Sequence, residues 1–324
     1  MIGVVIHEVG HNFFPMIVNS DERQWTWMDE GLNSFMEYMA EQELGTNFPS
    51  RRGPAKNIVP YMSGDQKFLE PIMSNSENIY QFGNNAYGKP ATGLNILRET
   101  VMGRELFDHA FKVYANRWKF KHPTPEDFFR TMEDASAFDL DWFFRGWFYS
   151  TDFVDIGVED VKQYYVSETA TSDLKEVKVR KGRFGLDKGP FVYLVSGQNS
   201  ELNANDKKAL KIDDVKLLSD YVNQNLSADE KANLKAPKYF YEVTFNKPGG
   251  MIMPILVEIT YEDDTKESFK YPAQIWRKNN DTAKKVYATA KAIKQIQIDP
   301  KLETADIDVT NNTWPKQETK SKFD

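Results

Sequence analysis

The sequence contains no cysteine and only four histidines among its 324 residues. Without cysteine the chain can form no disulfide, no thiolate metal site and no cysteine nucleophile, although this absence says little about the cellular compartment. No apolar run approaches the roughly 20 residues that a transmembrane helix needs. We therefore expect no membrane-spanning segment.

An excess of basic charge is also absent, because 41 lysines and arginines stand against 48 acidic residues, which gives a net charge of −7 and a pI near 5.4. A general nucleic-acid-binding protein would present a basic surface, so no nucleic-acid partner is expected. The sequence shows no internal repeat, and its length is sufficient for two domains.

Two of the four histidines enclose a glutamate near the start of the sequence, as His7-Glu8-Val9-Gly10-His11. On a helix, positions i and i+4 share one face, so both imidazoles can bind one metal ion while Glu8 projects beside it. Two imidazoles and a carboxylate suit Zn²⁺ with an open position for water, and Glu8 is then the candidate general base. The neighbouring residues are apolar on nearly every side, which predicts a buried helix: Ile2, Val4, Val5, Ile6 and Val9.

Eighteen residues separate the second histidine from Glu30, which is the candidate third metal ligand. Glu37 lies seven residues further along the same predicted helix and therefore on nearly the same face. Ligating histidines usually donate their other ring N–H to a carboxylate or a carbonyl, a role open to Glu37 or to Asp29. An ordinary structural carboxylate remains the alternative for Glu37. His109 and His122 have no ligand partners nearby in the sequence.

The sequence resembles the M1 family of zinc metallopeptidases, the gluzincin aminopeptidases. The resemblance lies in the order of its motifs, which is H-E-x-x-H, eighteen residues, then E-G and a helix ending in Glu37-Tyr38. The resemblance implies a mainly helical, thermolysin-like catalytic lobe, a Zn²⁺ cofactor and a peptide or protein substrate. It covers roughly residues 1–150, and the aromatic segment 139–149 resembles the end of the family's catalytic domain.

A second family signature, Y-E-K-G, has a counterpart downstream of the glutamate ligand. Tyr87 and Lys89 match it, whereas Gly88 and Pro90 depart from it. By resemblance, Tyr87 would donate a hydrogen bond to the oxyanion of the tetrahedral intermediate, a role for which a phenol is suited. A structural tyrosine at a helix start is the alternative, and Tyr80 is a rival candidate for the role.

Several M1 elements that precede the H-E-x-x-H helix have no counterpart here, including the G-x-M-E-N segment that holds the substrate's amino terminus. We therefore expect the sequence to be truncated before the zinc helix, with a possible missing amino-terminal part of the same protein. Aminopeptidase specificity then follows from the resemblance and not from residues. The location is not fixed by the sequence, although the resemblance favours an exported bacterial protein, periplasmic or extracellular.

Three regions are predicted: a helical catalytic lobe at 1–155, a mixed α/β connector at 156–237 and an immunoglobulin-like β-sandwich at 238–324. Alternating runs and turn residues indicate the strands, which are expected at 239–245, 253–261, 267–271 and 292–298. The acidic and amide-rich segment 306–312 suggests calcium only weakly. It lacks the EF-hand glycine and terminal glutamate, so a turn is expected there.

We therefore expect a zinc-dependent peptidase of the aminopeptidase type. Two other interpretations stay open. The chain could be a non-catalytic binding module built on a peptidase scaffold with a structural metal, or an incomplete and inactive fragment. A closed coordination sphere with a fourth protein ligand would favour the binding module, because catalytic zinc sites keep one position for water.

Overall fold

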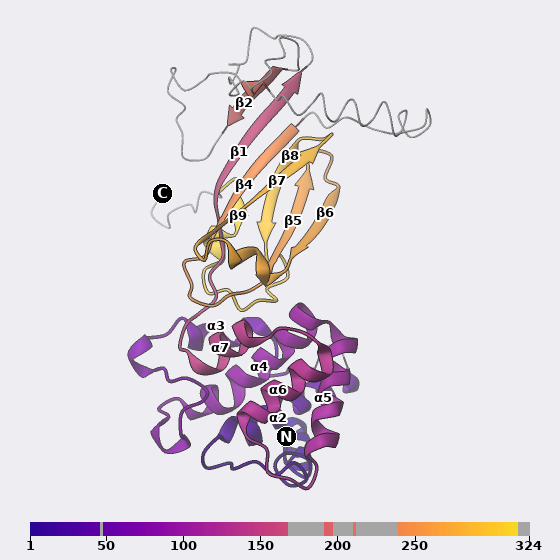
Figure 1. Cartoon of the computed structure of the whole chain (residues 1–324), viewed down its shortest axis with the longest axis vertical. Helices are drawn as coiled ribbons and strands as arrows, with labels where there is room; N and C mark the ends of the chain where they lie inside the picture. Colours follow the sequence, from indigo (N-terminus) through magenta and orange to yellow (C-terminus); the bar gives the residue numbers. More distant parts are fainter. Residues whose placement is uncertain (46–47, 168–190, 197–209, 212–238, 317–324) are drawn as a thin grey trace.

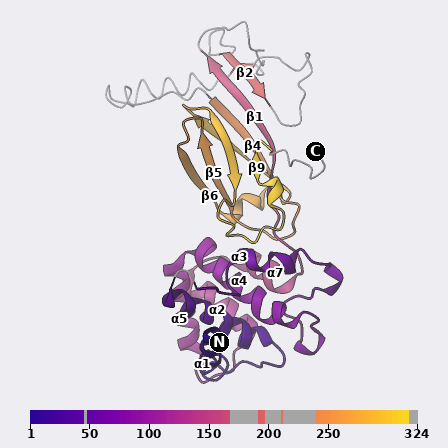
Figure 2. The ribbon, with the colours of Figure 1, turned by 180° about the vertical axis from the view of Figure 1, so that it is seen from behind.

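The computed structural model describes residues 1–45, 48–167, 191–196, 210–211 and 239–316. Figure 1 shows a helical lobe, which contains the amino terminus, and a β-sheet region stacked beyond it. The view from behind in Figure 2 shows the same two-part arrangement. The principal helices are α1 (Ile2–Gly10), α2 (Leu32–Leu44), α3 (Ala55–Met62), α4 (Lys89–Ile96), α5 (Arg104–Trp118), α6 (Pro125–Ser136) and α7 (Asp141–Tyr149).

Short wider turns of π-helix lead into or out of these helices at Trp27–Gly31 (η1), Gly83–Gly88 (η4) and Leu97–Met102 (η5). Local sequence explains several boundaries. Thr124 and Asp127 form a capping box at the start of α6, and Pro125 occupies its first turn, where the missing N–H costs no intrahelical bond. Gly103, with φ of 87°, separates η5 from α5.

Aromatic side chains fill the core of the helical lobe. Trp27 stacks on Phe129 with ring centroids 5.8 Å apart, and Phe129 stacks on Phe144 at 4.3 Å. Large aromatic side chains dominate the energetics of such cores because each removes a large apolar area from water. The fully buried members also include Phe35, Phe107, Tyr114, Phe128, Phe143, Trp147 and Phe148. No helix among the described residues is long and apolar enough to cross a membrane.

Two antiparallel sheets make up the β region. One has the strand order β3-β2-β1-β4-β7 and the other β6-β5-β8-β9. In β5 every second side chain is buried, as expected of a strand with one face on a core. The strand bounds are β1 (Gly157–Ser167), β2 (Phe191–Ser196), β3 (Leu210–Lys211), β4 (Tyr239–Asn246), β5 (Ile255–Tyr261), β6 (Lys266–Tyr271), β7 (Thr282–Thr289), β8 (Ile293–Ile298) and β9 (Thr313–Trp314).

The prediction of a helical part followed by β structure therefore agrees with the architecture, and the immunoglobulin-like topology stays a prediction. The expected connector at 156–237 contains β1, which pairs with β4 from Gly157 opposite Asn246 to Tyr165 opposite Tyr239. One sheet thus crosses the boundary predicted after residue 237, although the domain limits themselves stay predictions. The sequence pattern also predicts a strand at 174–180 and helices at 213–223 and 227–234, and these three segments lie outside the described residues.

The prediction that α1 is a buried helix is wrong for this chain. Ile2, Val4, Val5 and Val9 are each more than half exposed, and His7 is the only buried residue of α1. The physical reason is that α1 packs mainly against α2, and no other described helix or strand makes a comparably extensive contact with it. The apolar residues of a helix predict that it prefers to be buried. Burial also requires a second element that packs on the helix, and the sequence of the helix does not specify that element.

Candidate active site

The two histidines of the motif point from α1 toward α2, and a buried amide fixes this helix pair. Asn33, in the first turn of α2, is fully buried and donates from Nδ2 to the backbone carbonyl of His7 at 2.7 Å. Gly10 lies against the same side chain, since a Cβ at this position would lie 1.9 Å from Asn33 Oδ1. The glycine inside the motif thus permits the close approach that brings His7 to α2.

Glu30 lies in η1, immediately before α2, and meets both histidines. Its Oε2 atom is 2.9 Å from His7 Nε2 and 3.5 Å from His11 Nε2. One donor atom from each of the three residues lies within 4.8 Å of the other two. The structure therefore brings together the three residues that the sequence nominates as metal ligands.

These separations suit a zinc ion. Tetrahedral Zn²⁺ with donor distances of about 2.0–2.2 Å holds its ligand atoms roughly 3.4 Å apart, and the measured 2.9 and 3.5 Å lie on either side of that value. Two imidazoles and one carboxylate are also a donor set typical of catalytic zinc. The residues present therefore fit the ion that the family resemblance implies.

The outer ring nitrogens of the two histidines each have an acceptor. Glu37 Oε2 lies 3.0 Å from His7 Nδ1. His11 Nδ1 donates to the backbone carbonyl of Phe14 at 2.9 Å, and Asp29 Oδ1 lies at the same distance without hydrogen-bond geometry. Such contacts direct Nε2 of each ring toward Glu30, the side on which a metal ion would bind. The Phe14 carbonyl was missed by sequence reasoning, since backbone acceptors carry no side-chain signal.

The carboxylates around the two histidines shift one another's pKa and that of His7. Hydrogen bonds to Glu30 and then Glu37 raise the pKa of His7 to about 9, against the opposing effect of burial. Burial raises the pKa of Asp29 to about 7, and the neighbouring Glu30 acts in the same direction. Despite its own burial, Glu30 keeps a lowered pKa because of its hydrogen bonds to His7 and Tyr87.

The two candidate catalytic residues lie in different settings. Glu8 is exposed on α1, and no hydrogen bond or ion pair joins its carboxylate to the described residues, so it is open to water. Tyr87, at the end of η4, donates its hydroxyl hydrogen to Glu30 Oε1 at 2.5 Å, and its ring stacks on His7 with centroids 5.8 Å apart. Burial and the bond to Glu30 raise the pKa of Tyr87, which keeps the phenol protonated.

Sequence reasoning also missed Arg52, whose guanidinium carbon lies 4.2 Å from the centroid of the Tyr87 ring. No motif marks this residue, because its position depends on a turn between α2 and α3. The other sequence candidates lie apart from the centre. Tyr80 is exposed and meets the Phe68 ring edge-on, while His122 contacts the Asn19 carbonyl. Pro90 is the second residue of α4, where a proline is readily accommodated.

Comparisons with known proteins identify a matching family model and several similar sequences. A family model described as Peptidase family M1 domain matches residues 1–147. Glutamyl aminopeptidase of Homo sapiens is 24% identical over 165 residues, which cover 49% of this chain and 17% of that protein. Probable aminopeptidase 2 of Sulfurisphaera tokodaii is 27% identical over 152 residues, which cover 44% of this chain and 19% of that protein.

A solved structure of Legionella pneumophila aminopeptidase A in complex with aspartic acid aligns with a TM-score of 0.48 and 14% identity, covering 91% of this chain and 25% of that chain. The matched regions thus amount to less than a fifth of the length of the two curated relatives. Residues 1–147 of this chain are thus similar to the peptidase family M1 domain, and the two curated relatives of this region are named aminopeptidases.

Proposed function

We propose that this chain hydrolyses peptide bonds as a zinc-dependent peptidase of the aminopeptidase type. The observation that carries the proposal is the convergence of His7 Nε2, His11 Nε2 and a Glu30 carboxylate oxygen on one point, with each outer imidazole nitrogen against an acceptor. The relatives named aminopeptidases support the reaction class. The substrate is then a peptide or protein.

His7, His11 and Glu30 would hold the ion. When bound, Zn²⁺ would supply Lewis-acid polarisation of the scissile carbonyl and would lower the pKa of a water molecule to near 7. Glu8 accepts the proton of the attacking water and later returns it to the leaving amine. Its exposed carboxylate, unengaged by any described side chain, is suited to this exchange.

Tyr87 is placed to supply a hydrogen bond to the developing oxyanion. Its hydroxyl reaches the metal-binding carboxylate at Glu30 Oε1, so it lies beside the position where a carbonyl oxygen would approach the centre. A raised pKa keeps its proton available as a donor. A donor that engages only the charge formed during the reaction accelerates the chemical step, because it binds the transition state better than the substrate.

The alternative of a binding module with a structural metal predicts a fourth protein ligand. Among the described residues, the histidine and carboxylate group around this point contains three members and not four. Three ligands leave one position for water, which is the arrangement of catalytic sites. The exported location expected from the resemblance stays a prediction, and cell fractionation of the source organism would test it.

Replacing Glu8 with glutamine tests the proposal. The Glu8→Gln variant should keep its zinc, measured by metal analysis, and should lose peptide hydrolysis by about a hundredfold or more, because the proton acceptor is gone. Glu43→Gln is the matched control, since Glu43 is an exposed carboxylate on α2. Unchanged turnover by Glu8→Gln would exclude Glu8 as the base.

Parallel assays with peptides that carry free or acetylated amino termini test the aminopeptidase type. Cleavage of the acetylated peptides alone would contradict it.

A further inference from the structure

A cavity of about 510 Å³ lies beside Tyr87. Two of its lining side chains pack directly on that tyrosine. The Arg52 guanidinium carbon lies 4.2 Å from the ring centroid, and the Phe82 ring meets it edge-on at 6.1 Å. The cavity therefore adjoins the ring of Tyr87 through these two side chains. Its other lining residues include Arg51, Tyr80, Asn84 and Thr92.

The charge of this cavity is positive and unbalanced. Arg51 and Arg52 line it, and no aspartate or glutamate does. Within the part of the chain that the structure describes, neither arginine forms an ion pair. Arg52 contacts the Ser34 hydroxyl at 3.4 Å and the face of Tyr87, and neither partner carries negative charge. In a protein with a net charge of −7, two arginines without a carboxylate are ready to bind an anion.

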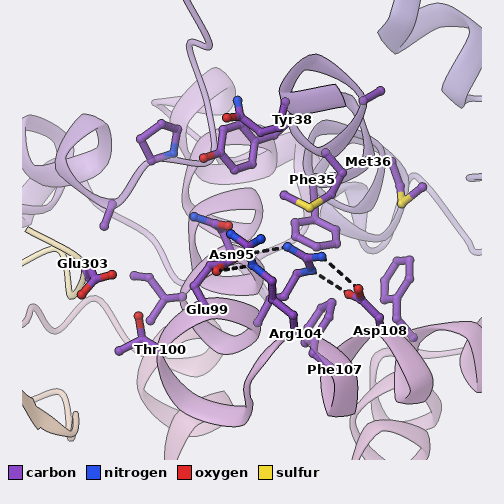
Figure 3. A pocket seen from close by; sticks show the side chains of 18 of the residues that line it. Phe35, Met36, Tyr38, Asn95, Glu99, Thr100, Arg104, Phe107, Asp108 and Glu303 are labelled. Atoms are coloured by element: carbon purple, nitrogen blue, oxygen red, sulfur yellow. Dashed lines mark hydrogen bonds and ion pairs between the residues drawn. The ribbon is translucent and has the colours of Figure 1, made fainter. Parts of the chain in front are cut away.

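A second cavity shows the opposite arrangement. It has a volume of about 880 Å³ and lies between α2, η5 and α5. Figure 3 shows the side chains around it, with Asp108 and Glu99 lying against the basic groups. Arg98 binds Asp108 through two hydrogen bonds of 2.6 and 2.9 Å, and Arg104 binds Glu99 at 2.8 Å. The arginines of the larger cavity are thus neutralised within the protein, whereas those beside Tyr87 are not.

The turn that carries the two arginines is fixed by hydrogen bonds from neighbouring helices. Asn57 Nδ2 donates to the carbonyls of Ser50 and Arg51, both at 3.2 Å. Asn95 Nδ2 donates to the carbonyl of Gly53 at 3.1 Å, and Gly53 has φ of 100°, a conformation that favours glycine. A prearranged backbone reduces the entropy lost when a ligand binds.

We propose that this cavity is a substrate subsite in which Arg51 and Arg52 bind a carboxylate of the peptide. The inference rests on the proposed peptidase function, because the cavity adjoins Tyr87. Guanidinium groups bind carboxylates through paired, charge-assisted hydrogen bonds, and the aromatic rings of Tyr80 and Phe82 give the aliphatic part of a side chain an apolar surface. The carboxylate belongs either to an acidic side chain or to the carboxyl terminus of a short peptide.

Matched peptides separate these sources. Tripeptide amides with glutamate or glutamine at the first, second or third position, in an alanine background, isolate the side-chain carboxylate. Trialanine with a free or an amidated carboxyl terminus isolates the terminal one. Equilibrium binding is measured with the zinc-loaded Glu8→Gln chain, and kcat/KM is measured with the unmodified chain. We expect one acidic peptide to be favoured over its neutral partner by about tenfold in both measurements.

Arginine variants then locate the preference. Arg51→Gln and Arg52→Gln should each reduce the acidic-to-neutral ratio at least threefold, and Arg52→Lys should restore part of it, since the charge returns without the planar donor pair. Lys112→Gln is the control, because it removes one positive charge from an exposed residue at the larger cavity. The ratio cancels any general effect on turnover.

The two proposals fail in different ways. Binding that favours the carboxylate and depends on both arginines, with no hydrolysis of any peptide, would refute the peptidase function and retain the subsite. Hydrolysis with equal rates for acidic and neutral partners, unaffected by the arginine variants, would overturn the subsite and retain the function. Absence of any carboxylate-dependent binding would also overturn the subsite.

Discussion

The contact between Glu37 and His7 yields a prediction whose size can be worked from the structure. Glu37 Oε2 lies 3.0 Å from His7 Nδ1, and the two side chains are only 16% and 10% exposed. A charge-assisted hydrogen bond in such a shielded place contributes about 1.5–3 kcal/mol. Since about 1.4 kcal/mol corresponds to a factor of ten, Glu37→Ala should weaken zinc binding by roughly 10- to 100-fold.

A graded series distinguishes the carboxylate from a mere acceptor. Glu37→Gln can keep a neutral hydrogen bond to the imidazole, so its zinc affinity should fall between those of the unmodified chain and Glu37→Ala. Affinity is measured by competition with a chromogenic chelator at constant pH, with Glu43→Gln as the control on the exposed side of the same helix. Affinities of both Glu37 variants within twofold of the unmodified chain would refute the role of Glu37 in orienting His7.

Three other predictions concern packing, catalysis and pH. Gly10→Ala should lower the free energy of unfolding by about 1–3 kcal/mol, because the added Cβ would displace Asn33. Gly83→Ala is the control, because a Cβ at that position would have no neighbouring atom within 4 Å, and it should change stability little in the same thermal melts. Tyr87→Phe should lower kcat by about 10²–10³ with metal content retained, and a change confined to KM would argue against oxyanion stabilisation. Burial lowers the pKa of Lys89 from 10.5 to about 8, so between these pH values the unfolded chain binds one proton more than the folded chain. The free energy of unfolding should therefore rise with pH in this range, by up to about 3 kcal/mol relative to that of Lys89→Met. Denaturant titrations of both chains at pH 8 and pH 10.5 test this, and a difference in unfolding free energy between the two chains that is the same at both pH values would disprove it.

The strands show which parts of the fold a local sequence pattern predicts and which it does not. Runs predicted at 239–245 and 267–271 correspond closely to β4 and β6, since their residues are rich in the aromatic and alternating patterns that strands favour. By contrast β7, Thr282–Thr289, was not predicted, because it carries lysines and its place at the edge of a sheet comes from pairing with β4. Pairing between distant segments is not encoded in either segment alone.

For the candidate site, the sequence by itself determined the convergence of His7 and His11, because a four-residue spacing on a helix places two side chains on one face whatever surrounds it. It also nominated Glu30, Glu37 and Tyr87 through their spacing and the family resemblance. Only the tertiary structure decided what these residues touch.

Two of the contacts that complete the site join segments far apart in the chain, because Asn33 holds α1 against α2 and Arg52 lies over Tyr87. Neither could be read from a linear pattern, because each depends on the packing of separate helices and turns. The third contact, from His11 to the Phe14 carbonyl, is local, but its acceptor is a backbone atom that no residue type marks. The chemistry of the centre is therefore local in origin, whereas its orientation and the charge beside it are properties of the fold.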